Sequence, residues 1–184
     1  MSIKYKFSNP EGLYFVTFAV VGWIDVFTRV VYKDILIEIF AYCIKEKGLR
    51  IHSYVIMSNH VHMIISANVG SRLEHIMRDM KKYATYRILK EIRANVVESR
   101  RDWMLFLFAK AGKANSNNTH CQFWQQDNHP IELDLHNTRV LQQKLAYIHQ
   151  NPVKAGLVSM ASSYIYSSAL DYEGGRGVLK VMLL

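Results

Sequence analysis

The sequence predicts an α+β fold: a ferredoxin-like (RRM-like) antiparallel sheet with helices packed on it. Short apolar runs of strand length alternate with longer segments whose apolar residues recur every three or four positions. In chain order these segments are strand, helix, hairpin, helix, strand and helix, which is typical of a ferredoxin-like domain. The hairpin, formed by Leu49–Met57 and His60–Ser66, is expected near the middle of the sheet.

Composition fits one globular domain over residues 1–184. The chain is 50% hydrophobic and 21% charged, so it can bury a sizeable core. Lysine and arginine outnumber aspartate and glutamate by 23 to 15, which gives a formal net charge of +8. This excess favours a polyanionic partner such as nucleic acid over an anionic membrane surface.

The cysteines and the hydropathy of the sequence exclude several classes of protein. The two cysteines, Cys43 and Cys121, lie far apart and in no CxxC pattern, so neither a disulfide framework nor a zinc ribbon is indicated. The longest apolar run, Leu13–Ile24, is too short for a transmembrane helix. We therefore expect a cytoplasmic protein with no membrane partner.

The first half of the chain contains clear strand and helix signals. Leu13–Val21 is dense in Phe, Val and Thr and reads as a strand buried on both faces. Asp34–Lys47 carries a helical apolar stripe and is ended by Gly48. A longer helix from Arg72 to about Ala94 buries one stripe and presents a strongly basic outer face. From that face we predict DNA contacts by Lys81, Lys82 and Arg87, together with Lys154 further along the chain.

The second half is less regular. Residues 94–120 read as an insertion, with a helix at Ser99–Lys110 and a polar loop at Ala111–Thr119. Strands are predicted at Phe123–Gln126 and Ile131–Leu133. The last main helix begins at Asn137 or Thr138 and is expected to end at Asn151-Pro152, because the residue before proline disfavours the α region. The apolar tail, residues 175–184, is expected to add an edge strand to this sheet or to a second copy, so a homodimer is one expectation.

His60 and His62 are the first candidate site residues. If Val61–Ile65 is a strand, its period of two puts both histidines on one face, roughly 7 Å apart, within reach of one metal ion. A pair of solvated histidines at a strand end is the plain alternative. The His-hydrophobe-His pattern is thus a candidate half-site for a divalent cation.

Tyr147 and Asn151 are the second pair. They stand four residues apart on the last helix, so their side chains share one face with Lys144, at the border of the buried stripe. A boundary tyrosine and a helix-ending asparagine would explain the same pattern.

The chain resembles the HUH-type single-tyrosine transposases, in particular the REP-associated kind, in several motifs that occur in the right order. These motifs are NHVHMII at residues 59–65, FWQQDNHPIEL at 123–133, YIHQNPVKAGLV at 147–158 and YSSALDY at 166–172. Together they extend the similarity from about Leu13 to Tyr172.

The resemblance implies a function and a set of site residues. It implies that His60 and His62 bind Mg²⁺ or Mn²⁺, that Asn151 is a polar third ligand and that Tyr147 is the nucleophile. Related transposases carry Gln where this chain has Asn151. The implied substrate is single-stranded DNA, cut at hairpin-forming repeats through a 5′-phosphotyrosine link. Two imidazoles and an amide oxygen would leave coordination positions open for phosphate oxygens.

Three other functions remain as alternatives. An HUH replication initiator or relaxase is expected to offer a third histidine, for which His52 and His75 are the nearby candidates, though neither has the spacing. A non-catalytic RNA-binding domain of ferredoxin-like fold would expose aromatic residues on its central strands, where this chain has His60 and His62. A metal-dependent hydrolase would use water in place of Tyr147.

Overall fold

The computed structural model describes residues 7–114, 121–126 and 129–184. Its main elements are β1 (Leu13–Ala19), α1 (Val30–Lys47), β2 (Leu49–Ile56), β3 (His60–Ala67), α2 (Leu73–Ala94), α3 (Arg101–Lys113), β4 (Ile131–Leu133), α4 (Thr138–Lys154) and α5 (Ala169–Tyr172). Short 3-10 turns lie at Val21–Trp23, Val26–Thr28 and Ala161–Ser163. Within the described ranges, no helix combines the length and apolar character needed to cross a membrane.

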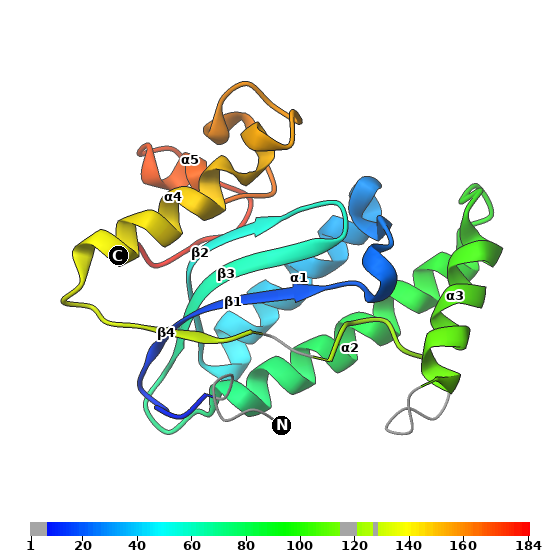
Figure 1. Ribbon diagram of the computed structural model, residues 1–184, viewed down its shortest axis with the longest axis horizontal. Coiled ribbons are helices and arrows are strands. Elements are labelled where there is room, and N and C mark those ends of the chain that lie inside the picture. The colour runs from blue at the N-terminus through cyan, green and yellow to red at the C-terminus, as the bar shows by residue number, and fades with distance from the viewer. Residues whose placement is uncertain (1–6, 115–120, 127–128) are drawn as a thin grey trace.

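The four strands form one antiparallel sheet in the order β2-β3-β1-β4 (Figure 1). With α1 between β1 and β2 and α2 between β3 and β4, this is the ferredoxin-like arrangement that the sequence predicts. Helix α3 is an addition between α2 and β4. The hairpin strand β3 is an inner strand, because it pairs with β1 on one side and β2 on the other.

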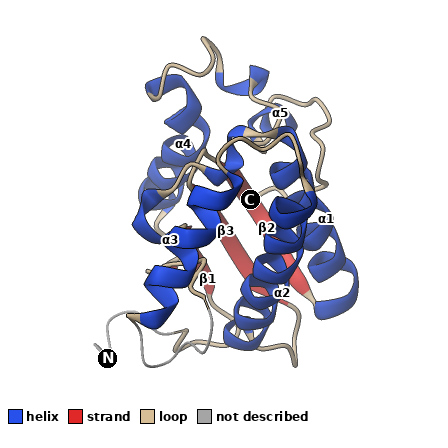
Figure 2. Ribbon diagram, turned by 90° about the vertical axis from the view of Figure 1, so that its right-hand side faces the viewer, coloured by secondary structure: helices blue, strands red, loops and turns tan. Residues whose placement is uncertain are grey.

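Helices cover both faces of the sheet. Helices α1 and α2 lie side by side on one face (Figure 2), where Val16, Phe18 and Met63 contribute to the larger core cluster. Helix α4 covers the other face, where Phe15 and Ile64 pack with Ile148 in a smaller cluster. Alternate residues of β1 and β3 therefore face different helices, as the pleat of a strand requires.

The segment predicted as a strand at Phe123–Gln126 forms only an isolated bridge, between Val20 and Trp124. Two backbone hydrogen bonds attach the segment to the end of β1, Val21 N to Phe123 O at 2.8 Å and Gln125 N to Ala19 O at 2.8 Å. Aromatic packing provides the rest, with the ring of Trp124 5.0 Å from that of Phe18. Asp127 and Asn128, which follow, lie outside the described residues.

The prediction that the last helix ends at Asn151-Pro152 is wrong. Helix α4 continues through Pro152 to Lys154, because the next bond of the helix, from Ala155 N to Asn151 O, forms at 3.0 Å. Gly156 ends it in the left-handed conformation, with φ +71°, and the N–H of Leu157 returns to Pro152 O. These are the bonds of a Schellman cap, for which glycine is the preferred residue.

The predicted insertion and tail also differ in detail. Helix α3 extends over Ala111–Lys113, which we expected to be loop; residues 115–119 lie outside the described residues. The tail forms no strand over the described Val178–Leu184. It instead lies against the edge of β2, where Met182 N donates to Ile51 O at 2.9 Å and His52 Nδ1 donates to Met182 O at 3.0 Å. This contact lies at the register shift of the β2–β3 ladder, between Ile51 and Ser53.

Candidate active site

Two histidines of β3 face α4. His60 pairs with Ala19 and His62 with Thr17 across the β1–β3 ladder. Because the two histidines are separated by one residue, both side chains project from the same face of the sheet, and their ring centroids lie 4.7 Å apart. The strand pattern thus brings the two imidazoles into contact.

Hydrogen bonds orient both rings. Asn59 Nδ2 donates to Asp25 Oδ1 at 2.9 Å, so the other side of its amide presents Oδ1 to His60 Nδ1 at 2.7 Å. His60 then carries its proton on Nδ1, and the lone pair lies on Nε2. His62 Nδ1 lies 2.7 Å from Thr17 Oγ1, and this hydroxyl oxygen can accept a hydrogen bond from an Nδ1–H group. With both rings in this tautomer, each Nε2 can bind a cation while the other nitrogen is held by a neighbouring oxygen.

Burial keeps both rings neutral. It lowers the pKa of His62 to about 3, and the charges of His60 and Lys144 act in the same direction. It also lowers the pKa of His60. Neither imidazole therefore has to lose a proton at neutral pH before its nitrogen lone pair is available.

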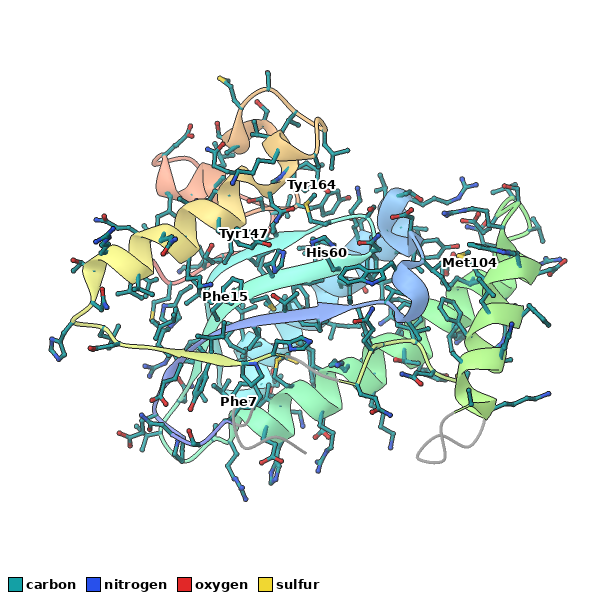
Figure 3. All side chains as sticks on the ribbon, in the orientation of Figure 1. Phe7, Phe15, His60, Met104, Tyr147 and Tyr164 are labelled. Atoms are coloured by element: carbon teal, nitrogen blue, oxygen red, sulfur yellow. The ribbon has the colours of Figure 1, made fainter. Side chains whose placement is uncertain are left out.

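Tyr147 approaches the histidines from α4. Its neighbours Ile148 and His149 are buried, and His149 Nε2 lies 3.1 Å from Ser53 Oγ of β2, which ties the helix to the sheet. Tyr147 is 42% exposed, and its hydroxyl lies 3.5 Å from His62 Nε2. Figure 3 shows Tyr147 and His60 on the same side of the sheet. Three of the predicted site residues, His60, His62 and Tyr147, thus come together.

Phe15 and Lys144 complete this side of the site. The ring of Phe15 stacks 5.7 Å from that of His62 and lies edge-on 6.0 Å from that of Tyr147. Lys144 Nζ is 4.6 Å from the centre of this same Phe15 ring, a cation–π contact. The helical face predicted for Tyr147 included Lys144, but the sequence assigned it no role.

Asn151 lies one helical turn after Tyr147 and is partly buried. In the part of the chain that the structure describes, no hydrogen bond holds its side-chain amide. That amide can therefore rotate toward a ligand without breaking an existing bond. Within the same described residues, no three His, Cys, Asp or Glu side chains are grouped to hold a metal. The predicted set of two histidines and an asparagine amide is of a kind that such a grouping would not include.

The predicted DNA-contacting cations are not gathered at this site. Lys81, Lys82 and Arg87 belong to α2, which packs on the opposite face of the sheet from α4. Lys81 Nζ donates to Gln125 O at 3.3 Å, and Arg87 Nη2 forms an ion pair with Glu38 at 2.9 Å, whereas Lys82 is exposed. Of the four, only Lys154 lies on α4, where it is exposed in the last turn.

Sequence reasoning missed Thr17 and Asn59 as partners of the histidines. The signal for Thr17 was its position as a polar residue in an otherwise apolar strand. Asn59 stands next to His60 in the NHVHMII motif, but its orientation depends on hydrogen bonds to Trp23 and Asp25, which are distant in sequence.

Comparison with known proteins gives one family. Residues 23–114, half of the 184-residue chain, match the family model described as "Transposase IS200 like". This range contains His60 and His62, whereas Tyr147 and Asn151 lie beyond it. No curated protein matches the chain.

Two solved structures are similar in fold. A REP-associated tyrosine transposase bound to a REP hairpin superposes with a TM-score of 0.67 at 17% identity, covering 99% of this chain and 92% of that one. A transposase-like protein from Deinococcus radiodurans gives a TM-score of 0.45 at 16% identity, covering 81% of this chain and 98% of that one. At 17% identity, the first match supports the fold.

Proposed function

Because the chain belongs to the IS200-like transposase family, we propose that it cuts and rejoins single-stranded DNA with Tyr147 as nucleophile. The observation that carries this proposal is the 3.5 Å approach of the Tyr147 hydroxyl to His62 Nε2. Tyr147 and the two histidines come from segments far apart in sequence and meet on one face of the sheet. A boundary tyrosine selected only for packing would not need this neighbour.

The proposed substrate is DNA that folds into hairpins. The structurally similar REP-associated transposase is bound to a REP hairpin, and we extend the same class of substrate to this chain. The net charge of +8 suits a polyanion. Two free cysteines, Cys43 and Cys121, agree with a protein that works in the cytoplasm.

The residues present fit a divalent metal. His60 and His62 offer Nε2 atoms, since their Nδ1 atoms are engaged by Asn59 and Thr17. Asn151 would supply an amide oxygen as third ligand. Oxygen donors suit both Mg²⁺ and Mn²⁺. When bound, the cation supplies Lewis-acid chemistry that polarises the scissile phosphate and offsets its developing negative charge.

The covalent step needs no nucleotide cofactor. The phenolic oxygen of Tyr147 attacks the scissile phosphorus and forms a new P–O bond, while the bond from phosphorus to the 3′-oxygen breaks. The phenol proton passes to solvent, to which Tyr147 is partly exposed, and the 3′-oxygen leaves and takes up a proton. The product is a 5′-phosphotyrosine link and a free 3′-hydroxyl. Attack on this link by another 3′-hydroxyl reverses the step and joins the new pair of ends.

The alternatives are less well supported. For a replication initiator or relaxase, a third histidine is expected at the site, yet His52 is engaged by Ser66 and Met182 and His75 belongs to α2 on the opposite face. An RNA-binding sheet uses exposed aromatic residues on its inner strands, where His60 and His62 stand instead. A hydrolase that uses water is separated from our proposal by the covalent adduct.

The test compares the protein with its Tyr147→Phe variant on a labelled single-stranded hairpin oligonucleotide with Mn²⁺ or Mg²⁺. Denaturing gels detect the adduct, and mass spectrometry of the adduct peptide locates it. We expect an adduct at Tyr147 and none in the variant, whose stability falls by at most about 1 to 1.5 kcal/mol, the worth of one hydrogen bond. Tyr83→Phe, on the other face, is the matched control and should form the adduct normally. An adduct in Tyr147→Phe, or cleavage without any adduct, would refute the assignment of Tyr147 as the nucleophile.

A further inference from the structure

Trp23 lies beside the site in an unusual conformation. Its φ is +55°, and only one other non-glycine among the described residues, His129, also has a positive φ. A bulky residue rarely adopts this left-handed region, because its Cβ crowds the following carbonyl oxygen. The preceding Gly22, at φ +63°, adopts the same region at no such cost.

Burial of the Trp23 side chain does not offset the energetic cost of this backbone conformation. The Trp23 side chain is 56% exposed, although tryptophan is one of the largest apolar side chains. The other two tryptophans differ from it: Trp124 is buried, and Trp103 is exposed on the regular helix α3. Trp23 thus combines a strained backbone with an exposed indole, a combination that is unfavourable for folding alone.

The backbone around Trp23 is held in place by hydrogen bonds. Its N–H donates to Val20 O at 3.0 Å, and its carbonyl oxygen accepts from Asn59 Nδ2 at 3.1 Å. The same Asn59 amide holds His60 Nδ1 through its Oδ1 atom. One side chain therefore fixes both the tryptophan and a proposed metal ligand. Strained residues held in this way occur mostly at functional sites, where the surrounding structure maintains them.

The indole lies directly against this histidine. Its ring centroid is 5.9 Å from that of His60, with an interplanar angle of 77°. A phosphate held at His60 and His62 would therefore place the sugar and base of an adjoining nucleotide within reach of the indole. Exposed aromatic rings bind single-stranded nucleic acid by stacking on bases, whatever the sequence.

We propose that Trp23 is a stacking platform for the base of one of the two nucleotides that share the scissile phosphate. This inference rests on the proposed function, because that function places the phosphate. It adds a binding residue for the single strand, with an unpaired base as its ligand. The strained backbone directs the indole toward the DNA, and stacking holds the scissile bond next to Tyr147.

The experiment couples protein variants to abasic oligonucleotides. Affinity is measured in the Tyr147→Phe background, with the hairpin oligonucleotide intact or carrying one abasic nucleotide at each successive position near the cleavage site. Trp23→Gly removes the ring and tolerates positive φ, and Trp23→Asn is a second variant that tolerates this region. Trp23→Phe retains an aromatic face. Tyr42→Ala, which removes an exposed ring from α1 on the other face of the sheet, is the matched control.

We expect Trp23→Gly and Trp23→Asn to bind the intact oligonucleotide about 5- to 150-fold more weakly, the range for loss of one stacked base. Their melting temperatures should remain close to that of the parent, because the strain is relieved. On the oligonucleotide that is abasic at one position flanking the scissile phosphate, this difference should disappear. Trp23→Phe should retain most of the affinity, and Tyr42→Ala should behave as the parent protein.

Equal affinity of the parent and both ring-deleted variants for the intact oligonucleotide would overturn the inference. So would a loss of the same size at every abasic position, which indicates a general rather than a stacking effect. A large fall in melting temperature in both variants would also overturn it, because Trp23 would then be a packing residue. A further outcome is that the affinity loss of the Trp23 variants disappears at one abasic position although the unmodified protein forms no adduct. That result would support the stacking role of Trp23 and refute Tyr147 as the nucleophile.

Discussion

At the scale of single residues, Lys144 stands beside the proposed active site. Its ammonium group is held above Phe15, and Phe15 contacts both Tyr147 and His62. Its charge also opposes protonation of His62 and lowers the pKa of that residue. A cation held there can contact a phosphate oxygen and stabilise a tyrosine oxygen that is losing its proton.

We therefore predict that Lys144→Met slows formation of the Tyr147 adduct by about tenfold or more, because it removes a positive charge from the site. Methionine keeps a similar stem over Phe15, so folding and melting temperature should be nearly unchanged. Lys144→Arg keeps the charge and should restore most of the rate. Single-turnover kinetics with saturating oligonucleotide measure the effect. Equal rates for the Met and Arg variants would show that the charge plays no part.

At the scale of elements, the regular strands and helices could be predicted because their apolar periodicities are strong. The elements that were misjudged depend on other forces. Phe123 and Trp124 have the composition of a strand but bury their rings in an aromatic cluster. Pro152 lies where a helix often ends, yet α4 accommodates it one turn before Gly156 provides the true cap.

The site could be predicted only in part. His60, His62 and Tyr147 stand in motifs whose spacing survives in the fold. The contact of Asn59 with His60 and the proposed role of Trp23 could not be predicted, because they depend on a left-handed backbone and on contacts between distant segments. The cations of α2 were chosen because a helical pattern shows which residues are exposed. Such a pattern does not show which face of the sheet the helix covers.

A pH prediction concerns the contact between β2 and the tail. Burial lowers the pKa of His52 in the folded protein, while an unfolded histidine keeps its ordinary pKa near 6.5. As pH falls below about 6.5, the unfolded chain takes up the proton more readily, so stability decreases. His52→Gln cannot take up this proton. The melting temperature of this variant should fall less than that of the parent between pH 7.5 and 5.5. An equal decrease in both proteins would contradict the lowered pKa of His52.

At the scale of the whole molecule, the proposed active site and most of the predicted DNA-contacting cations lie on opposite faces of the sheet. Lys154 shares α4 with Tyr147, whereas Lys82 lies on the outer side of α2. A short single strand bound at Tyr147 can reach Lys154, but only DNA that passes around the sheet can also reach Lys82. The length of the substrate therefore decides which cations contribute.

We predict that Lys154→Gln reduces the slope of log affinity against log salt by about 0.7 for a short single strand, the value for one phosphate contact. Lys82→Gln should leave that slope unchanged with the short strand and reduce it only with a long hairpin. Fluorescence anisotropy over a salt series measures both slopes. A reduced slope for Lys82→Gln on the short strand would place the DNA on α2 instead.

The tail along β2 has a consequence for the behaviour of this protein in concentrated solution. An outer strand with unpaired N–H and C=O groups is a template on which other copies aggregate. At the edge of β2, Ser167 forms a β-bridge with Val55, and Met182 N donates a hydrogen bond to Ile51 O. Two separate segments therefore cover that edge. At the opposite edge, β4 is only three residues long and offers little length for pairing. Both edges of the sheet therefore offer little unpaired strand length for edge-to-edge polymerisation.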